Sequence, residues 1–176
     1  MALSRADFHD LVDGHAPALY RLAYRLIGDP HDAEDVVQET LRSAWTSRER
    51  YDGERFGGAE PDANRGQRAW LASILRRRVV DRWRRVGRIP TPAGDRSLEV
   101  PVDAEDPLAL EFTDEMQFAL KQLSSELRES LLLVVVGGLT HQETADSLGV
   151  PLGTILSRVS RARQRLRQHF LSATKP

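Results

Sequence analysis

Positive charge is concentrated in one stretch of the sequence, AWLASILRRRVVDRWRRVGR, at residues 69–88. Together with Arg68, this stretch holds eight arginines and a single acidic residue, Asp81, although the formal net charge of the whole chain is −1. Guanidinium groups present N–H donors in a planar fork that matches phosphate oxygens, and clusters of them attract polyanions. The residue types in this stretch therefore predict a surface that binds a phosphate-rich polymer.

The same stretch has the apolar spacing of a single helix with two faces. The stripe that should face a core comprises Leu71, Leu75, Val79, Trp83 and Val86. On the opposite face lie Arg77, Arg84 and Arg88, seven and four residues apart, and we expect these three to contact the polyanion. Asp81 should hold in place one of the arginines within its helical reach, which are Arg77, Arg78, Arg84 and Arg85.

A second basic helix is predicted near the C-terminus, in the segment LTHQETADSLGVPLGTILSRVSRARQRL at 139–166. A helix-turn-helix needs a small residue where its helices cross, a glycine in the turn and apolar residues that lock the two helices. Ala145, Gly149 and Ile155 occupy these positions. Helical hairpins with a glycine turn also occur in bundles that bind no DNA, but the basic second helix favours DNA binding.

Local signals in the sequence also predict where these two helices begin. Thr140 and Glu143 have capping-box spacing, and Pro151 suits the first position of the second helix. Side chains near the start of a recognition helix read base edges in the major groove, whereas arginines further along reach phosphates. The candidate contacts are Thr154, Ser157, Arg158, Ser160, Arg161 and Arg165.

The elements that position these residues all have helical periodicity, which predicts an all-α protein. Residues 4–27 form a first helix, with Pro17 as a possible kink and Gly28 as its stop. Asp29 or Asp32 caps a second helix that ends at about residue 47. Its predicted buried stripe is Ala33, Val36, Val37, Leu41, Ala44 and Trp45.

Two further segments lack an apolar period. Residues 51–66 hold four glycines and a proline and are predicted to be a loop. Residues 89–108 are rich in proline and acid and read as a flexible linker. The predicted architecture is therefore two small helical domains, 1–88 and 109–172, joined by this acidic linker. Two basic blocks separated by an acidic one suggest a polyanion held at two places.

Composition argues against several other classes of function. The chain has no cysteine, and its five histidines lack metal-ligand spacing, so we expect no disulfide, metal site or cofactor. No apolar run is long enough to span a membrane, the N-terminus lacks a signal core, and we expect a cytoplasmic protein. The carboxylates Asp32, Glu34 and Asp35 are typical of a helix's first turn. We therefore expect neither an enzyme nor a small-molecule substrate.

Three segments together resemble a known family. HAPALYRLAYRLIGDPHDAEDVVQETLRSAW (15–45), WLASILRRRVVDRWRR (70–85) and LSSELRESLLLVVVGGLTHQETADSLGVPLGTILSRVSRARQRLR (123–167) are similar, in order, to bacterial sigma factors of the sigma-70 family. The resemblance is to the small extracytoplasmic-function (ECF, group IV) type, which consists of regions 2 and 4. It implies that the protein binds core RNA polymerase and directs promoter-specific initiation of transcription.

The resemblance also implies a role for each block. Region 2 would dock on the clamp helices of the polymerase β′ subunit through Asp32, Asp35, Gln38, Glu39 and Arg42. It would recognise and melt the −10 element, where the candidate contacts are Arg77, Arg84, Arg88, Arg65 and Asn64. Region 4 would sit on the β flap while its helix-turn-helix reads the −35 element. The family resemblance further implies an anti-sigma factor as a partner.

The sequence departs from the family pattern at two functional positions. The family often has Asn where this chain has Arg77, and often Lys where it has Leu156. Two alternatives stay open. One is a helix-turn-helix regulator that does not dock on polymerase. The other is a sigma-like module that binds an anti-sigma factor without initiating transcription.

Overall fold

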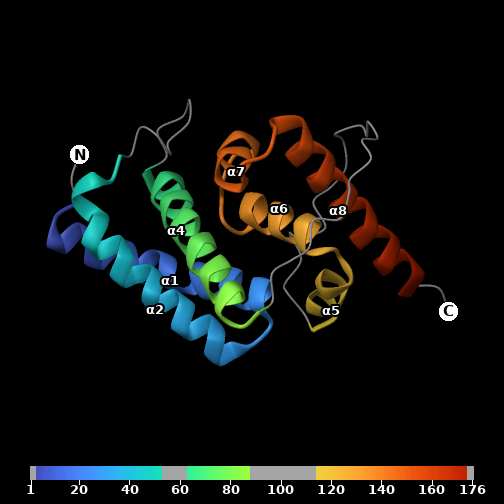
Figure 1. The fold of residues 1–176 in the computed structure, drawn as a ribbon, viewed down its shortest axis with the longest axis horizontal. Helices are drawn as coiled ribbons and strands as arrows, with labels where there is room; N and C mark the ends of the chain where they lie inside the picture. Colours follow the sequence, from blue (N-terminus) through green and yellow to red (C-terminus); the bar gives the residue numbers. More distant parts are fainter. Residues whose placement is uncertain (1–2, 53–62, 88–113, 174–176) are drawn as a thin grey trace. The chain divides into compact units, whose positions relative to one another are not determined.

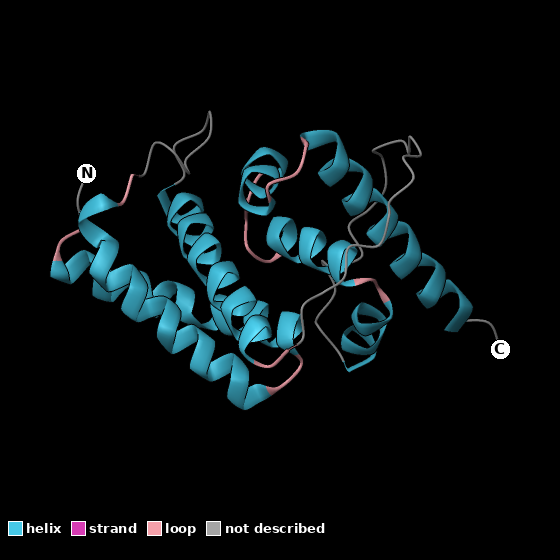
Figure 2. Cartoon of the chain, in the orientation of Figure 1, coloured by secondary structure: helices cyan, strands magenta, loops and turns pink. Residues whose placement is uncertain are grey.

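The computed structural model describes residues 3–52, 63–87 and 114–173, and every regular element in these ranges is a helix (Figures 1 and 2). The all-α prediction is therefore confirmed. The predicted linker 89–108, Arg88 and most of the predicted 51–66 loop lie outside the described residues. The elements are α1 (Arg5–Ile27), α2 (Pro30–Ser47), η1 (Arg48–Arg50), α4 (Ala63–Arg85), α5 (Asp114–Gln122), α6 (Ser125–Val135), α7 (His141–Leu148) and α8 (Leu152–Ala173).

The chain forms two compact units. The first comprises Met1–Ile89 with the short segment Val136–Leu139, and the second comprises Pro90–Val135 and Thr140–Pro176. In the first unit α1, α2 and α4 pack against one another, and in the second α8 contacts α5, α6 and α7. Each unit thus presents one long basic helix, α4 or α8, on a small helical scaffold.

The connection between α1 and α2 follows from two local signals. Gly28 ends α1 in the left-handed conformation (φ 84°), and its N–H donates to the Tyr24 carbonyl at 2.7 Å. Asp29 then caps α2, because its carboxylate accepts the Asp32 N–H at 2.9 Å. Pro17 lies inside α1 without dividing it. The short connection makes α1 and α2 an antiparallel hairpin, against which α4 packs.

Most residues of the stripes predicted to face the core of the first unit are buried. The last residue of each stripe is not, and for these two the prediction is wrong. Trp45 was predicted to be buried but is 38% exposed; the Phe8 ring contacts it edge-on at 5.1 Å, and the Arg48 guanidinium lies 4.1 Å from its ring centre. Val86 is 48% exposed, because it follows the end of α4 at Arg85. The buried apolar residues include Phe8, Leu11, Leu19, Leu22, Leu26, Val36, Leu71, Leu75 and Val79.

In the second unit, α7 and α8 form the predicted helix-turn-helix. Thr140 and Glu143 make the reciprocal capping box, and Gly149 ends α7 with φ 66°. Pro151 precedes α8, which begins one residue later than predicted, and its carbonyl accepts the Thr154 N–H at 3.0 Å. The core side of α8 consists of Ile155, Val159, Ala162 and Leu166, all nearly inaccessible. The opposite side of α8 is thereby left for a ligand.

Candidate nucleic-acid interface

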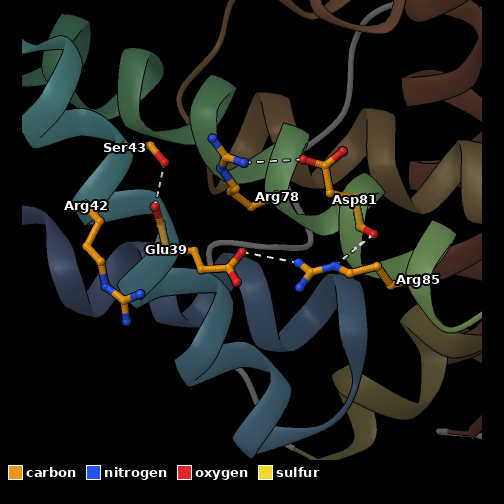
Figure 3. A pocket seen from close by; sticks show the side chains of 6 residues that line it. All are labelled: Glu39, Arg42, Ser43, Arg78, Asp81 and Arg85. Carbon is orange, nitrogen blue, oxygen red and sulfur yellow. Dashed lines mark hydrogen bonds and ion pairs between the residues drawn. The ribbon is translucent and has the colours of Figure 1, made fainter.

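Ion pairs join the acidic helix α2 to the arginine-rich helix α4. Arg82 pairs with Asp32, and Arg85 Nη2 lies 3.3 Å from Glu39 Oε2. Figure 3 shows Glu39 and Arg85 reaching toward one another from the two helices. Asp32 and Arg82 are about 30% exposed, so water screens their pair only in part. The two helices are therefore held together by charge as well as by the apolar core beneath.

Asp81 anchors arginines on its own helix, as its position predicted. Its carboxylate lies 3.4 Å from Arg78 Nη1 and 4.0 Å from Arg84 Nη1, and its carbonyl accepts from Arg85 Nε at 3.4 Å. Arg77 makes no such contact and is exposed. Of the predicted strand contacts, Arg84 is thus partly held by Asp81, whereas Arg77 is not among the arginines that Asp81 contacts.

The five residues predicted to dock on polymerase do not form one uniform face. Asp35, Gln38 and Arg42 are exposed, and Arg42 Nη2 donates to Gln38 Oε1 at 3.2 Å. Asp32 and Glu39 instead face α4 and pair with its arginines. The exposed face of α2 therefore carries charges of both signs. The carboxylates of Asp32 and Glu39 form ion pairs with α4.

A groove of about 430 Å³ between α2 and α4 brings Arg77 together with residues that sequence reasoning missed. It is lined by Ser43, Thr46, Ser47, Arg50, Ile74, Arg77 and Arg78, so three guanidinium groups and three hydroxyls face it without any lining carboxylate. Arg50 stands directly before the predicted loop, which was the available signal. Such a groove suits a phosphate and its attached nucleotide.

The hydroxyls of this groove are already oriented. Ser43, Thr46 and Ser47 each donate to a backbone carbonyl four residues earlier on α2, at 2.7, 3.0 and 2.8 Å. Their lone pairs are therefore left to accept hydrogen bonds from the groove. A neighbouring groove, lined by Glu39, Arg42, Ser43, Arg78, Asp81 and Arg85, continues past Ser43 and Arg78 (Figure 3). Arginines thus line a continuous path along α2 and α4, and its second groove also contains the carboxylates of Glu39 and Asp81.

Asn64 and Arg65 lie at the other end of α4. The helix begins at Ala63, so these two residues are helical rather than part of the predicted loop. At 1.5 Å per residue, Arg65 is roughly 28 Å from Arg84 along the helix axis. The five residues predicted for one strand contact therefore do not meet at one point, and Arg88 lies outside the described residues.

One histidine beside this helix is buried, and burial lowers its pKa. His15 on α1 is 5% exposed, and its Nε2 lies 3.4 Å from Gln67 Oε1 on α4. Burial lowers the pKa of His15 below its ordinary value; the hydrogen bond to Gln67 opposes this effect and the charge of Arg68 adds to it. His15 is thus a packing residue between α1 and α4.

The recognition helix presents its predicted residues unequally. Arg158 Nη2 lies 3.2 Å from Glu126 Oε2 of α6, and the two side chains are only 11% and 17% exposed. Arg158 is therefore directed toward the domain interior. Arg161 contacts the Ser157 hydroxyl, with its Nε at 3.2 Å. Thr154 and Ser160 are half-buried and Arg165 is exposed.

Other site types are not found in the part of the chain that the structure describes. Its His, Asp and Glu side chains make no group of three that could hold a metal ion. None of the described helices combines the length and apolar character that crossing a membrane requires.

A helix-turn-helix with a basic second helix, and a separate helical unit with an arginine-lined path, define a two-domain DNA-binding protein of the sigma type. Family models for "Sigma-70 region 2" and "Sigma-70, region 4" match residues 11–58 and 113–166. The chain belongs to the ECF sigma factors of the sigma-70 family, as its relatives and solved structures also indicate.

Among curated proteins, the chain is 37% identical to the ECF RNA polymerase sigma factor SigE of Mycolicibacterium smegmatis, over 92% of this chain and 60% of SigE. It is 36% identical to SigL of Mycobacterium tuberculosis, over 94% of this chain and 88% of SigL. It therefore spans less than two thirds of SigE but most of SigL.

Two solved structures share the fold. The sigma factor RpoE of Bartonella quintana, in complex with the anti-sigma factor NepR, matches with a TM-score of 0.64 and 29% identity, over 96% of this chain and 99% of RpoE. CnrH, in complex with the cytosolic domain of CnrY, matches with a TM-score of 0.62 and 28% identity, over 98% of this chain and 92% of CnrH.

Proposed function

We propose that this chain binds core RNA polymerase and directs promoter-specific initiation of transcription through the −10 and −35 elements. The observation that carries the proposal is the pairing of an acidic helix, α2, with an arginine-rich helix, α4, in the same chain as a helix-turn-helix. A simple repressor or activator has no use for the α2–α4 arrangement. An initiation factor needs one surface for polymerase and another for DNA.

Docking on the β′ clamp helices would use the exposed residues Asp35, Gln38 and Arg42. Asp32 and Glu39 would take part from the edge of that face, where they also hold α4. The second domain would meanwhile sit on the β flap. The contacts with the clamp helices and with the flap are made by one chain. Once the first has formed, the second is effectively intramolecular, so the overall affinity for polymerase exceeds that of either contact alone.

The −10 strand would follow the arginine-lined path of the first unit. Arg77 lines a groove with Arg50 and Arg78, and Arg84 is exposed further along the same helix. Melted DNA has flexible phosphates and accessible base edges, which suit guanidinium donors and hydroxyl acceptors. Asn64 and Arg65 would contact DNA only at the far end of α4.

The −35 element would be read by the first turns of α8. Thr154, Ser157, Ser160 and Arg161 would reach base edges or phosphates, and Arg165 would reach the phosphates alone. Arg158 would act by orienting α8 through Glu126, since its guanidinium faces α6. This role differs from the base contact that the sequence suggested.

An anti-sigma factor is the proposed regulator. One of the solved structures reported above is of a sigma factor, RpoE, in complex with the anti-sigma factor NepR. The protein would act in the cytoplasm, where promoter DNA and polymerase are found. It would not be an enzyme itself, since polymerase supplies the catalysis.

Run-off transcription with purified core polymerase tests the proposal. Genomic fragments are incubated with core enzyme, with and without this protein, and transcripts are mapped. We expect defined start sites that depend on the protein. A helix-turn-helix regulator would bind DNA without binding core enzyme, and a sigma-like module would bind neither DNA nor a promoter complex. Absence of both core binding and specific transcripts would overturn the proposal.

A further inference from the structure

The recognition helix exposes two leucines where a helix-turn-helix meets the major groove. Leu152 is 39% exposed and Leu156 is 43% exposed. They are four residues apart on one face of α8, and Gly153 between them has open space around its Cα. The remaining side chains of the first two turns, from Thr154 to Val159, are half-buried or buried. The most exposed side chains at the start of α8 are therefore apolar.

Folding of the domain does not account for these leucines. The apolar face of α8 is already supplied by Ile155, Val159, Ala162 and Leu166, which are 0–2% exposed. Single exposed leucines are common on proteins and need no explanation. Leu171, 65% exposed at the far end of the same helix, is such a case. Leu152 and Leu156 differ because they form a pair on the segment of the helix that reads bases.

The surroundings of the pair indicate what covers it. Besides Arg158, which faces α6, four arginines lie between residues 161 and 167 of the same helix, so the rest of α8 is complementary to DNA phosphates. A helix drawn onto the major groove by these charges brings its first turns against base edges. Of the four bases, only thymine presents an apolar group there, its C5 methyl.

We propose that Leu156, flanked by Leu152, is a specificity-determining residue that packs on the C5 methyl of a thymine in the −35 element. The inference rests on the proposed function and deepens it. The polar and arginine side chains on the neighbouring face, Ser157 and Arg161, would contact the adjacent bases or phosphates.

Deoxyuridine tests the contact directly, because it differs from thymidine only by the missing methyl group. The −35 duplex is first selected with the holoenzyme, and each thymidine is then replaced singly by deoxyuridine. We expect the holoenzyme to bind about fourfold more weakly at one or two positions, the factor that corresponds to burying one methyl group. Leu156→Ala should lose a similar factor on thymidine DNA and should no longer distinguish deoxyuridine.

Two further variants keep the result interpretable. Leu171→Ala removes a more exposed leucine from the far end of the same helix and should retain full sensitivity to deoxyuridine. Leu156→Lys should lose that sensitivity while binding DNA through its charge. Unchanged circular dichroism and melting temperature confirm that each variant folds.

Three outcomes would overturn the inference. The first is a wild-type holoenzyme that binds its −35 element specifically but tolerates deoxyuridine everywhere. The second is Leu156→Ala retaining the discrimination, and the third is a selected element without A·T pairs. Failure of the proposed function looks different: no duplex is selected and no promoter-dependent transcript forms, whatever the bases.

Discussion

Arg85 of α4 and Glu39 of α2 form an ion pair with 3.3 Å between Nη2 and Oε2. One partner belongs to the helix proposed to dock on polymerase and the other to the helix proposed to follow the DNA strand. Polymerase would therefore compete with Arg85 for the Glu39 carboxylate, and DNA phosphates would compete with Glu39 for the Arg85 guanidinium. The exposure of both side chains limits the contribution of the pair to stability to about 0–1 kcal/mol.

The first prediction concerns this pair. Glu39→Gln should weaken binding to core polymerase, whereas Arg85→Gln should leave it unchanged or stronger, because it frees the Glu39 carboxylate. Arg85→Gln should also lower the salt dependence of promoter binding by about one unit of log–log slope. Fluorescence anisotropy with labelled core enzyme and a salt series of promoter binding measure the two effects. Equal loss of core binding in both variants would mean that Arg85 itself contacts polymerase.

The second prediction separates Arg158 from the other arginines of α8. Arg158→Ala should destabilise the second domain by about 3 kcal/mol, since it leaves Glu126 nearly buried and unpaired. Arg165→Ala, at an exposed position, should change stability by less than about 0.5 kcal/mol. Thermal unfolding followed by circular dichroism measures the difference.

A double variant sharpens this test. Arg158→Met combined with Glu126→Leu replaces the pair by apolar groups and should recover most of the lost stability. Wild-type stability of Arg158→Ala alone would show that the pair does not hold α8 in solution.

Arg161 carries the third prediction. Arg161→Ala should leave folding intact and weaken −35 binding, by about 1–3 kcal/mol if the guanidinium contacts a base. Binding to duplexes with single base changes in the −35 element identifies the position that is read. A uniform loss on all duplexes, together with a smaller salt slope, would assign Arg161 to a phosphate instead.

The fourth prediction addresses the arginine-lined groove. Arg77→Ala and Arg50→Ala should each reduce the yield of open complex and lower its salt slope by about one. Arg21→Ala is the matched control, because Arg21 is an exposed arginine on α1 away from this groove. Permanganate footprinting of the melted strand across a salt series gives the measurement. Wild-type melting in both groove variants would place the strand elsewhere.

The fifth prediction is a dependence of stability on pH. Burial lowers the pKa of His15, so below the ordinary histidine pKa the unfolded chain binds a proton that the folded chain does not. The free energy of unfolding should therefore fall as pH decreases from about 7 toward 5. His15→Gln should remove this part of the decrease, whereas His31→Gln, at an exposed position, should not. Denaturant titrations at each pH would contradict the prediction if the two variants behave alike.

Sequence reasoning succeeded where the physical cause is local. Gly28, Asp29, the Thr140–Glu143 capping box and Gly149 depend on residues within about four positions, and the structure has each as expected. The anchoring of arginines by Asp81 is likewise a matter of helical spacing. The prediction that Trp45 and Val86 are buried was wrong, because these residues lie near helix ends, where the core ends.

Which charged side chains form ion pairs could be learned only from the tertiary structure. From the sequence, Arg158 and Arg161 are equivalent basic residues on one helix, and Asp32 and Glu39 belong to the same acidic face as Asp35. Whether a charge pairs internally depends on the register and angle at which two helices pack, which join residues 32, 46 or 50 positions apart in the chain. The amino-acid sequence by itself determined the helices, their caps and the two basic blocks. Only the packing of α2 on α4 and of α6 on α8 decided which arginines are engaged and which side chains, including Leu152 and Leu156, are left exposed.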